Sequence, residues 1–261
     1  MLSKKNEQYI RSLALRKFRQ KYNNFVIEGD KMVRGLLEYP QAQIERIFAL
    51  PEWCATHQAM LAQYTEKVET VTPRELKKIS TLKTPNQVLA VVKQYEHRFS
   101  PDLLETSLSL YLDGIQNPGN LGTILRTADW FGVDWVVCSP DCADRFSPKV
   151  VQATMGALFS VQVVSRNFND LAVKTLNLPI YGAILKGENL FRSKLTKTGL
   201  IVIGNEGQGI RAAVQDQITH PVAIPPHANG GTESLNAAVA TSIICATFRN
   251  ASFFRNVDKI N

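Results

Sequence analysis

The stretch NPGNLGTILRTADWFGV, residues 117–133, joins a predicted strand to a predicted helix and shows how the second half of the chain is built. Its first four residues, Asn117 to Asn120, favour a turn that exposes backbone. Apolar residues then recur at helical spacing and would face a core: Leu121, Ile124, Leu125, Ala128 and Phe131. Arg126 lies opposite that stripe. It is either a solvated surface side chain or part of a site, and the choice between the two depends on the motifs in the rest of the chain.

Length and composition are those of an ordinary globular protein. The chain has 261 residues, of which 44% are hydrophobic and 20% charged. Its formal net charge of +7 favours a polyanionic partner such as nucleic acid. The first residues lack the apolar run of a signal peptide, and no later segment is long enough to cross a bilayer. We therefore expect no association with a membrane.

The cysteine pattern argues against a metal centre. Cys54, Cys138, Cys142 and Cys245 are scattered and form no CxxC pair. Cys54 and His57 would supply half of a metal site, but no second half follows at a suitable spacing. We expect buried free thiols, no metal ion and a reducing, cytoplasmic location.

Residues 1–95 are expected to form a small α/β domain. Predicted strands at 24–29, 43–50, 67–71 and 87–94 alternate with predicted helices at 30–38, 52–63 and 73–80. Thr72-Pro73-Arg74-Glu75 has the residues of a capping box with proline in the first turn. A basic helix over 1–23 precedes them. Its cations are either a solvated face or contacts for RNA phosphates: Arg11, Arg16, Lys17, Arg19 and Lys21.

Residues 96–107 lack periodicity and are interpreted as a linker to a second domain, 108–261. Strands are predicted there at 108–113, 134–138, 161–164, 179–184, 199–203 and 221–224, and a last helix at 234–249. Helical segments separate the strands. This alternation predicts the α/β class, with a largely parallel sheet covered on both sides.

Unusual residues gather where three of these strands end, the edge at which open parallel sheets bind ligands. The first cluster is 113–126, the second is the turn Gly204-Asn205-Glu206-Gly207-Gln208-Gly209, and the third lies in 222–244. The second cluster is not GxGxxG and lacks the lysine of a P-loop. Glu206 would repel a phosphate there, so the turn favours a neutral or cationic ligand. Ser234 is a helix cap, a site residue or both.

Together these clusters resemble the three ordered motifs of the SpoU (TrmH-like) RNA ribose 2′-O-methyltransferases of the SPOUT superfamily. The motifs are Asn117-x-x-Asn120-x-Gly122-x-x-x-Arg126, then Gly204-x-Glu206-Gly207-x-Gly209, then Ser234-Leu235-Asn236 with Ala240. The resemblance covers about residues 108–250. More loosely, the N-terminal half is similar to the family's substrate-binding domain, which is related to a kink-turn-binding ribosomal protein. The loop 225–233 is longer than usual for the family, which leaves the shape of the cofactor lid open.

The resemblance implies a C-terminal trefoil knot, bound S-adenosylmethionine and a homodimer with composite active sites. It implies catalytic roles for Arg126, Asn117, Glu206, Ser234 and Asn236. It implies cofactor contacts for Ile203, Gly204, Asn205, Glu206, Gly207, Ile224, Pro225, Ser234, Leu235, Asn236 and Ala240. The expected substrate is structured RNA, with rRNA favoured over tRNA because of the two-domain layout. A non-catalytic RNA-binding protein and a nucleotide-binding enzyme are the alternatives.

In similar enzymes, deprotonation of the ribose hydroxyl is assigned to the arginine of the first motif, which is Arg126 in this sequence. A guanidinium has a pKa above about 12 and stays charged, so an electrostatic role is better founded. We expect Arg126 to hold the target phosphate and to stabilise charge that develops on the 2′-oxygen. On this interpretation Arg126 lies off the apolar stripe because it belongs to the site.

Overall fold

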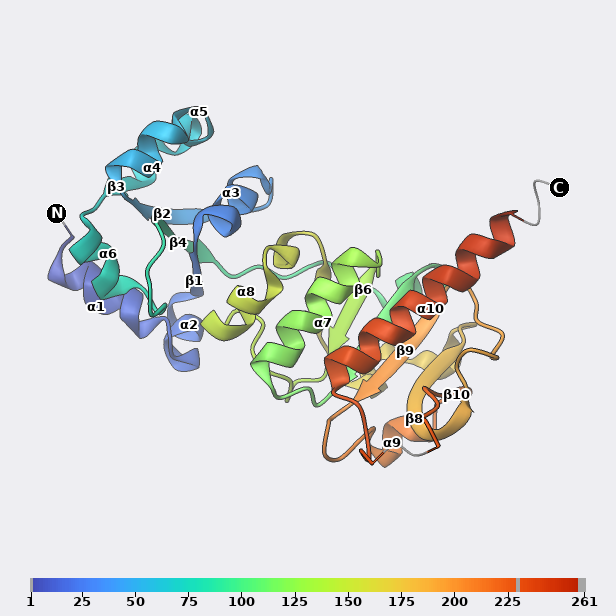
Figure 1. Cartoon of the computed structure of the whole chain (residues 1–261). Coiled ribbons are helices and arrows are strands. Elements are labelled where there is room, and N and C mark those ends of the chain that lie inside the picture. The colour runs from blue at the N-terminus through green and yellow to red at the C-terminus, as the bar shows by residue number, and fades with distance from the viewer. Residues whose placement is uncertain (1, 229–230, 258–261) are drawn as a thin grey trace. The chain divides into compact units, whose positions relative to one another are not determined.

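The structure is a computed structural model that describes residues 2–228 and 231–257 (Figure 1). The chain forms two compact units. Unit 1 comprises Met1–Tyr95 and Asp144–Phe159, and unit 2 comprises Glu96–Ala143 and Ser160–Asn261. Unit 1 is therefore assembled from two separate pieces of the chain. Residues 229 and 230 of the long loop 225–233 lie outside the described residues.

Unit 1 is built on a four-stranded sheet with the order β1-β4-β2-β3. The strands are β1 (Asn24–Glu28), β2 (Ile44–Ala49), β3 (Val68–Thr70) and β4 (Val88–Lys93). β4 pairs antiparallel with β1 and β2, and β3 pairs parallel with β2. Each strand lies within one of the four predicted ranges, so these strand predictions are confirmed. β-Branched side chains on β1 and β4 supply much of the buried apolar surface.

The helices of unit 1 differ from the prediction in two places. They are α1 (Lys4–Ser12), α2 (Arg16–Tyr22), α3 (Asp30–Glu38), α4 (Pro51–Thr56), α5 (Gln58–Leu61), the 3-10 helix η1 (Ala62–Lys67) and α6 (Pro73–Ile79). One helix over 1–23 was expected, but Leu15 is extended with ψ 132° and separates two helices. The expected helix 52–63 is interrupted at His57. The capping box of α6 is confirmed, because Thr72 and Glu75 exchange both of its hydrogen bonds.

The second piece of unit 1 contains α8 (Pro148–Thr154) and the 3-10 helix η3 (Ala157–Phe159). α8 packs against β1. The ring of Phe146 lies 4.6 Å from that of Phe25 on β1, and Tyr95 donates a 2.7 Å hydrogen bond to the carbonyl of Leu158. An aromatic ring contact and a hydrogen bond from a side-chain hydroxyl to the backbone thus tie this segment to the first 95 residues.

Unit 2 is built on a six-stranded sheet with the order β10-β8-β9-β5-β6-β7, and every strand pair in it is parallel. Its strands are β5 (Leu108–Asp113), β6 (Trp135–Cys138), β7 (Gln162–Ser165), β8 (Ile180–Asn189), β9 (Gly199–Gly204) and β10 (His220–Ala223). The parallel sheet confirms the predicted class. β8 extends five residues further than expected, because its end pairs with Val222 and Ala223 after a shift in register.

Two helices of unit 2, α7 (Pro118–Trp130) and α10 (Ala237–Val257), pack side by side over one face of the sheet (Figure 1). The hydroxyls of Thr127 and Ser242 meet between them at 2.9 Å. The remaining helices are short: α9 (Ala212–Gln215) and the 3-10 helices η2 (Pro101–Thr106), η4 (Phe168–Leu171) and η5 (Val173–Thr175). The connections η2 and η4 help to bury the other face of the sheet.

The four cysteines are all free, and three of them are buried. Among residues 2–228 and 231–257, no helix has both the length and the apolar character needed to span a bilayer.

Candidate active site

The three motifs meet at the carboxyl edge of the unit 2 sheet. Asn120 lies on the first turn of α7, Glu206 lies in the turn after β9, and Asn236 directly precedes α10. Asn120 Nδ2 donates a hydrogen bond to Glu206 Oε1, and Asn236 Nδ2 donates to Asn120 Oδ1 at 3.0 Å. We call these three side chains the Glu206–Asn120–Asn236 row. It joins segments that are up to 116 positions apart in the sequence.

Asn117 lies at the start of α7. It is the N-cap of α7, and its Oδ1 accepts hydrogen bonds from the backbone N–H groups of Gly119 (2.8 Å) and Asn120 (3.2 Å). Pro118 occupies the first position of the helix, where its missing N–H is harmless. Asn117 therefore orders the start of α7, and it makes no bond to the row. A direct catalytic role gains no support from this placement.

Asn120, which the sequence-based site omitted, is the central member of the row. The motif contained it, but nothing in the sequence distinguished it from Asn117. The signal was its spacing: a residue three positions after an N-cap lies on the first helical turn, and its side chain is left available for another segment.

Asn236, rather than Ser234, caps α10. Its Oδ1 accepts from the N–H groups of Ala238 (2.9 Å) and Val239 (3.3 Å), while its Nδ2 joins the row. Ser234 and Leu235 lie before the helix and are exposed. The interpretation of Ser234 as a helix cap is therefore wrong, and the helix begins three residues later than predicted.

The turn after β9 is closed on itself. Asn205 and Gly209 exchange two backbone hydrogen bonds, and Asn205 Oδ1 accepts from the N–H groups of Gly207 (2.9 Å) and Gln208 (3.1 Å). A side chain at position 204 would collide with the backbone of Gly209 and Ile210, so only glycine fits there. The result is a compact loop that presents the backbone of Glu206 and Gly207 at the surface.

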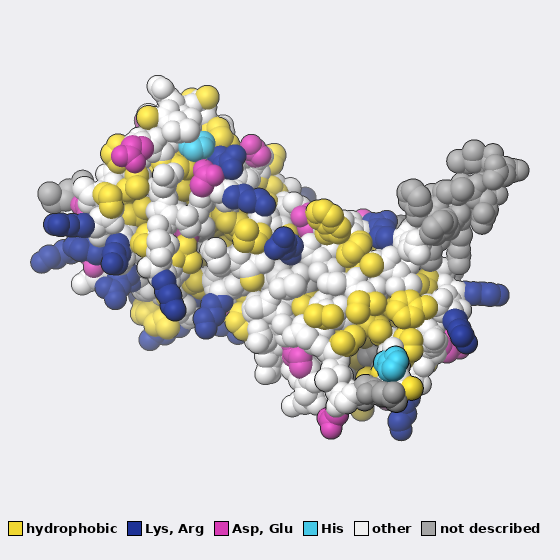
Figure 2. Space-filling view, viewed as in Figure 1, with side chains coloured by type: hydrophobic (Ala, Val, Ile, Leu, Met, Phe, Trp, Pro, Cys, Tyr) yellow, Lys and Arg dark blue, Asp and Glu magenta, His cyan; other side chains and the backbone are white. Residues whose placement is uncertain are grey.

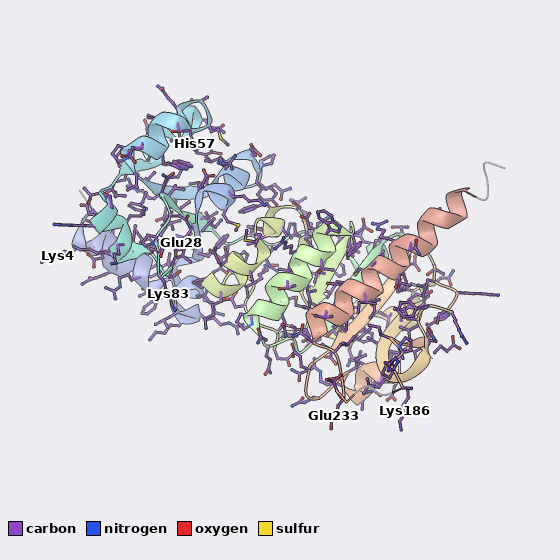
Figure 3. The ribbon with its side chains drawn as sticks, in the orientation of Figure 1. Lys4, Glu28, His57, Lys83, Lys186 and Glu233 are labelled. Atoms are coloured by element: carbon purple, nitrogen blue, oxygen red, sulfur yellow. The ribbon has the colours of Figure 1, made fainter. Side chains whose placement is uncertain are left out.

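The other predicted cofactor residues lie on the same edge or close to it. Ile203 is buried at the end of β9, and Ile224 and Pro225 directly follow β10. Ala240 is half-buried on the first turn of α10. Figure 3 shows Lys186 and Glu233 pointing outward from this edge. No group of three or more His, Cys, Asp or Glu side chains among the described residues is arranged to hold a metal ion.

Arg126 is exposed on the face of α7 that points away from the sheet. It lies six residues after Asn120, a rise of about 9 Å along the helix. Neither an ion pair nor a hydrogen bond of its side chain is found within the described part of the chain. The structure therefore brings Glu206, Asn120 and Asn236 together but does not join Arg126 to them within one chain.

Most of the predicted RNA contacts on α1 and α2 are exposed. Arg11, Arg16, Lys17 and Lys21 face solvent, and Figure 2 shows Lys and Arg side chains gathered over these two helices. The prediction that Arg19 contacts RNA is wrong. Its side chain is only 3% exposed, donates to the carbonyls of Leu13 and Ala14, and pairs with Asp144 at 2.6 Å. Arg19 is an internal tie of unit 1, with its donors occupied by the protein itself.

Known proteins are similar to this chain in both sequence and fold. Residues 107–246 match the model of the SpoU rRNA Methylase family, and residues 6–90 match an MRM3-like substrate binding domain. A curated relative is the 23S rRNA (guanosine(2553)-2′-O)-methyltransferase RlmP of Bacillus subtilis, 30% identical over 241 residues, which cover 90% of this chain and 92% of that protein. The 23S rRNA (guanosine-2′-O-)-methyltransferase RlmB of Escherichia coli is 32% identical over 158 residues, which cover 58% of this chain and 64% of RlmB.

Solved structures agree over almost the whole chain. A TrmH-family RNA methyltransferase from Porphyromonas gingivalis superposes with a TM-score of 0.82 and 38% identity, covering 96% of this chain and 99% of that one. An AdoMet-bound rRNA methyltransferase from Sinorhizobium meliloti superposes with a TM-score of 0.85 and 25% identity, covering 96% and 97%. The fold and its edge thus define an S-adenosylmethionine-dependent RNA methyltransferase of the SPOUT kind. The chain belongs to the SpoU rRNA methylase family.

Proposed function

We propose that this protein transfers the methyl group of S-adenosylmethionine to a ribose 2′-hydroxyl in structured RNA, and that the RNA is ribosomal. The Glu206–Asn120–Asn236 row carries the proposal, because it unites the three motifs at the edge where parallel sheets bind ligands. RlmP and RlmB, which act on 23S rRNA, support the choice of rRNA over tRNA.

The charges at this edge fit a cationic methyl donor. Glu206 is exposed there and Asp141, which follows β6, is 46% exposed, while the cation Arg211 lies 3.4 Å from Asp141. The sulfonium of the cofactor, which makes its methyl group reactive, carries a positive charge that these carboxylates tolerate. We assign cofactor binding to the backbone of Ile203 to Gly207, to Ile224 and Pro225, and to Ser234, Leu235, Asn236 and Ala240.

The reaction needs a ribose oxygen that is held in line and relieved of its proton. Arg126 is assigned to the RNA phosphate next to the target and to the charge that develops on the 2′-oxygen. Asn120 and Asn236 fix the geometry of the turn that bears Glu206. Asn117 takes part indirectly, by ordering the start of α7.

A homodimer would complete this site. An exposed stripe on α7 consists of Gly119, Thr123, Arg126 and Trp130. Beside it, α10 turns apolar residues outward: Val239, Ile243 and Ala246 are exposed or half-buried. Trp130 is 83% exposed and Val239 49%, and Figure 2 shows a band of hydrophobic side chains over α10. A second copy packed on these helices would cover that surface and carry Arg126 of one subunit to the site of the other. The trefoil knot implied by the family remains a prediction.

Unit 1 is assigned to RNA positioning through the exposed cations of α1 and α2. Phosphate contacts of this kind fix where a protein sits on its RNA without choosing a base. The four free thiols support a reducing compartment, which we take to be the cytoplasm.

The experiment is a comparison of 2′-O-methylation across total RNA from cells with and without the gene. One rRNA ribose is expected to lose its methyl group, and purified protein with S-adenosylmethionine should restore it on the unmodified RNA. The Asn120→Ala variant should not restore it. An unchanged rRNA methylation map, or a lost methyl group in tRNA alone, would overturn the proposed substrate.

A further inference from the structure

An ion pair between the buried Asp113 and the half-exposed Arg211 lies beside the turn after β9 and has no role yet in the candidate active site. Asp113, the last residue of β5, is fully buried. Arg211 lies two residues after Gly209, the last residue of the turn. Its backbone N–H donates to Asp113 Oδ2 at 2.8 Å, and its Nε donates to Oδ1 at 2.6 Å. A single arginine thus occupies both oxygens of the carboxylate.

The same arginine reaches a second strand end. Arg211 Nη2 lies 3.4 Å from Asp141 Oδ1, and Asp141 also accepts a 2.6 Å hydrogen bond from Ser139. The hydrogen bond from Ser139, followed by the positive charge of Arg211, lowers the pKa of Asp141. Arg211 therefore links the carboxyl ends of β5 and β6.

The beginning of the turn is anchored to the same place. Asn205 Nδ2 donates to the carbonyl of Gly114 at 2.8 Å, and the N–H of Gly114 donates to Ser139 Oγ at 2.9 Å. Gly114 follows Asp113 directly, so residues 205 and 211 are both held by the end of β5. Glu206 and Gly207 lie between these two anchors.

An ion pair that buries a carboxylate is weak support for stability, because the buried charge loses hydration and a well-packed apolar pair often serves the fold as well. What an arginine fork adds is a fixed direction: it holds planar carboxylates in one geometry, which a point charge on a flexible stem does not. Here the fork of Arg211 fixes the direction of the loop that bears Glu206.

We propose that Arg211, seated on Asp113 and Asp141, is a positioning residue that sets the Gly204–Gly209 turn for S-adenosylmethionine. The inference rests on the proposed function, which assigns the backbone of this turn to the cofactor. Loosening the contacts of Arg211 should then weaken cofactor binding specifically. RNA affinity should stay the same, because the exposed cations of unit 1 provide it.

The decisive variant is Arg211→Lys, which keeps a positive charge beside the buried carboxylate but loses the fork. Expected results are a Kd and a KM for S-adenosylmethionine raised about tenfold, in the range seen when a supporting hydrogen-bond partner is removed at metal sites. The KM for RNA, and kcat at saturating cofactor, should stay within about threefold of the parent, as a loss of binding alone requires. Asp141→Asn should show a smaller change in the same direction.

The matched control is Arg166→Lys, an exposed arginine of unit 2 whose side chain bonds only the neighbouring carbonyl of Ser165 among the bonds found in the described residues. It should leave every constant unchanged. If Arg211→Lys and Asp141→Asn lower the unfolding temperature but leave the cofactor KM within twofold of the parent, the pair is only structural and the proposal is wrong. If the parent itself neither binds S-adenosylmethionine nor methylates RNA, the proposed function fails instead.

Discussion

Asn117 and Asn120 are the same residue three positions apart, yet they have different roles. Asn117 uses its side-chain oxygen on two N–H groups at the start of α7. Asn120 uses both ends of its amide on other segments, donating to Glu206 and accepting from Asn236. A side chain that bonds only its own helix stabilises that helix, whereas one that bonds two distant segments fixes the geometry of a site.

The two asparagines should respond differently to mutation. Asn117→Ala removes a helix cap and should lower the free energy of unfolding by about 1 kcal/mol. Its rate of methyl transfer per folded molecule should stay close to the parent's. Asn120→Ala breaks the row and should slow transfer about 100-fold, the cost of a misplacement of about 1 Å. Urea unfolding and single-turnover assays separate the two effects; equal rates for both variants would refute the distinction.

Arg126 offers the sharpest test at this scale. Arg126→Ala should leave the fold and the cofactor affinity intact, because the side chain is exposed and off the apolar face. Methyl transfer at saturating RNA and cofactor should fall by about two orders of magnitude, the typical cost of removing one preorganised electrostatic partner. Arg126→Lys should restore little, since an ammonium lacks the planar fork. If both variants transfer the methyl group at a rate within a few-fold of the parent's, Arg126 is an ordinary solvated side chain with no part in the reaction.

At the scale of helices and strands, the ends of elements carry many of the polar contacts. α6 begins with a capping box in which Glu75 accepts from the N–H groups of Thr72 and Leu2, both at 2.9 Å. These bonds, the one from Thr72 first, lower the pKa of Glu75 to about 2. The folded protein thus holds this carboxylate ionised at a pH where the unfolded chain has protonated it.

A pH dependence follows from that shift. Because the pKa of Glu75 is lower in the folded state, its stabilising effect is complete above its ordinary pKa of 4.5 and is lost as the pH falls toward 2. Glu75→Gln keeps the shape of the capping box but cannot titrate. The variant should therefore lose less stability than the parent between pH 4.5 and 2 in urea titrations. The control is Glu66→Gln, at an exposed carboxylate nearby in sequence, which should show the parent's dependence of stability on pH. A Glu75→Gln variant that shows the same dependence as the parent would contradict the lowered pKa of Glu75.

The basic helix α2 gives a second prediction for an element. Lys17→Ala and Lys21→Ala should each weaken RNA binding and reduce the slope of log Kd against log salt by about 1, the loss of one phosphate contact. Lys67→Ala, at an exposed lysine of η1, is the matched control. Arg19→Ala should instead lower the stability of unit 1, because it leaves Asp144 without its ion pair. If both variants show the parent's slope of log Kd against log salt, α2 does not contact the RNA.

At the scale of the whole molecule, the proposed dimer leads to a prediction that a monomer would not fulfil. If one subunit supplies Arg126 to the other's site, mixing Arg126→Ala with Asn120→Ala should restore about a quarter of the parent activity. Half of the mixed dimers would be heterodimers, each with one intact site of two. Trp130→Glu should give a monomer by light scattering, and this monomer should have lost methyl transfer. No recovery on mixing, while the parent is dimeric, would place each site within one subunit.

Much of the fold could be predicted because local patterns report on burial. The alternation of apolar strands and helices predicted ranges close to the observed ones for the ten strands in the described part of the chain. It failed where the chain bends without glycine or proline, as at Leu15 and His57. Next to Leu15, the carbonyls of Leu13 and Ala14 accept hydrogen bonds from the Arg19 side chain, a contact that helix propensity does not report. It also missed the second half of β8, since that pairing depends on β10, more than thirty residues further along the chain.

The site was harder, because its contacts are long-range. The motifs located Glu206 and Asn236, but the pairing of Asp113 with Arg211 spans 98 positions and leaves no local pattern. The burial of Arg19 depends on Asp144, 125 positions away. A charged residue's neighbours in space decide whether it meets solvent, RNA or a buried partner, and a single sequence does not list those neighbours.

The segment Asp144–Phe159 has a consequence for anyone who engineers this enzyme. A substrate-recognition module is commonly exchanged between relatives by cutting at one linker, and here that cut would fall near residue 95. Such a graft would leave behind the piece of unit 1 that carries Phe146 and α8, with the apolar face that packs on β1 now in water. The truncated enzyme should aggregate. A workable chimera has to transplant both pieces together, because unit 1 is a single module encoded by two separate stretches of the chain.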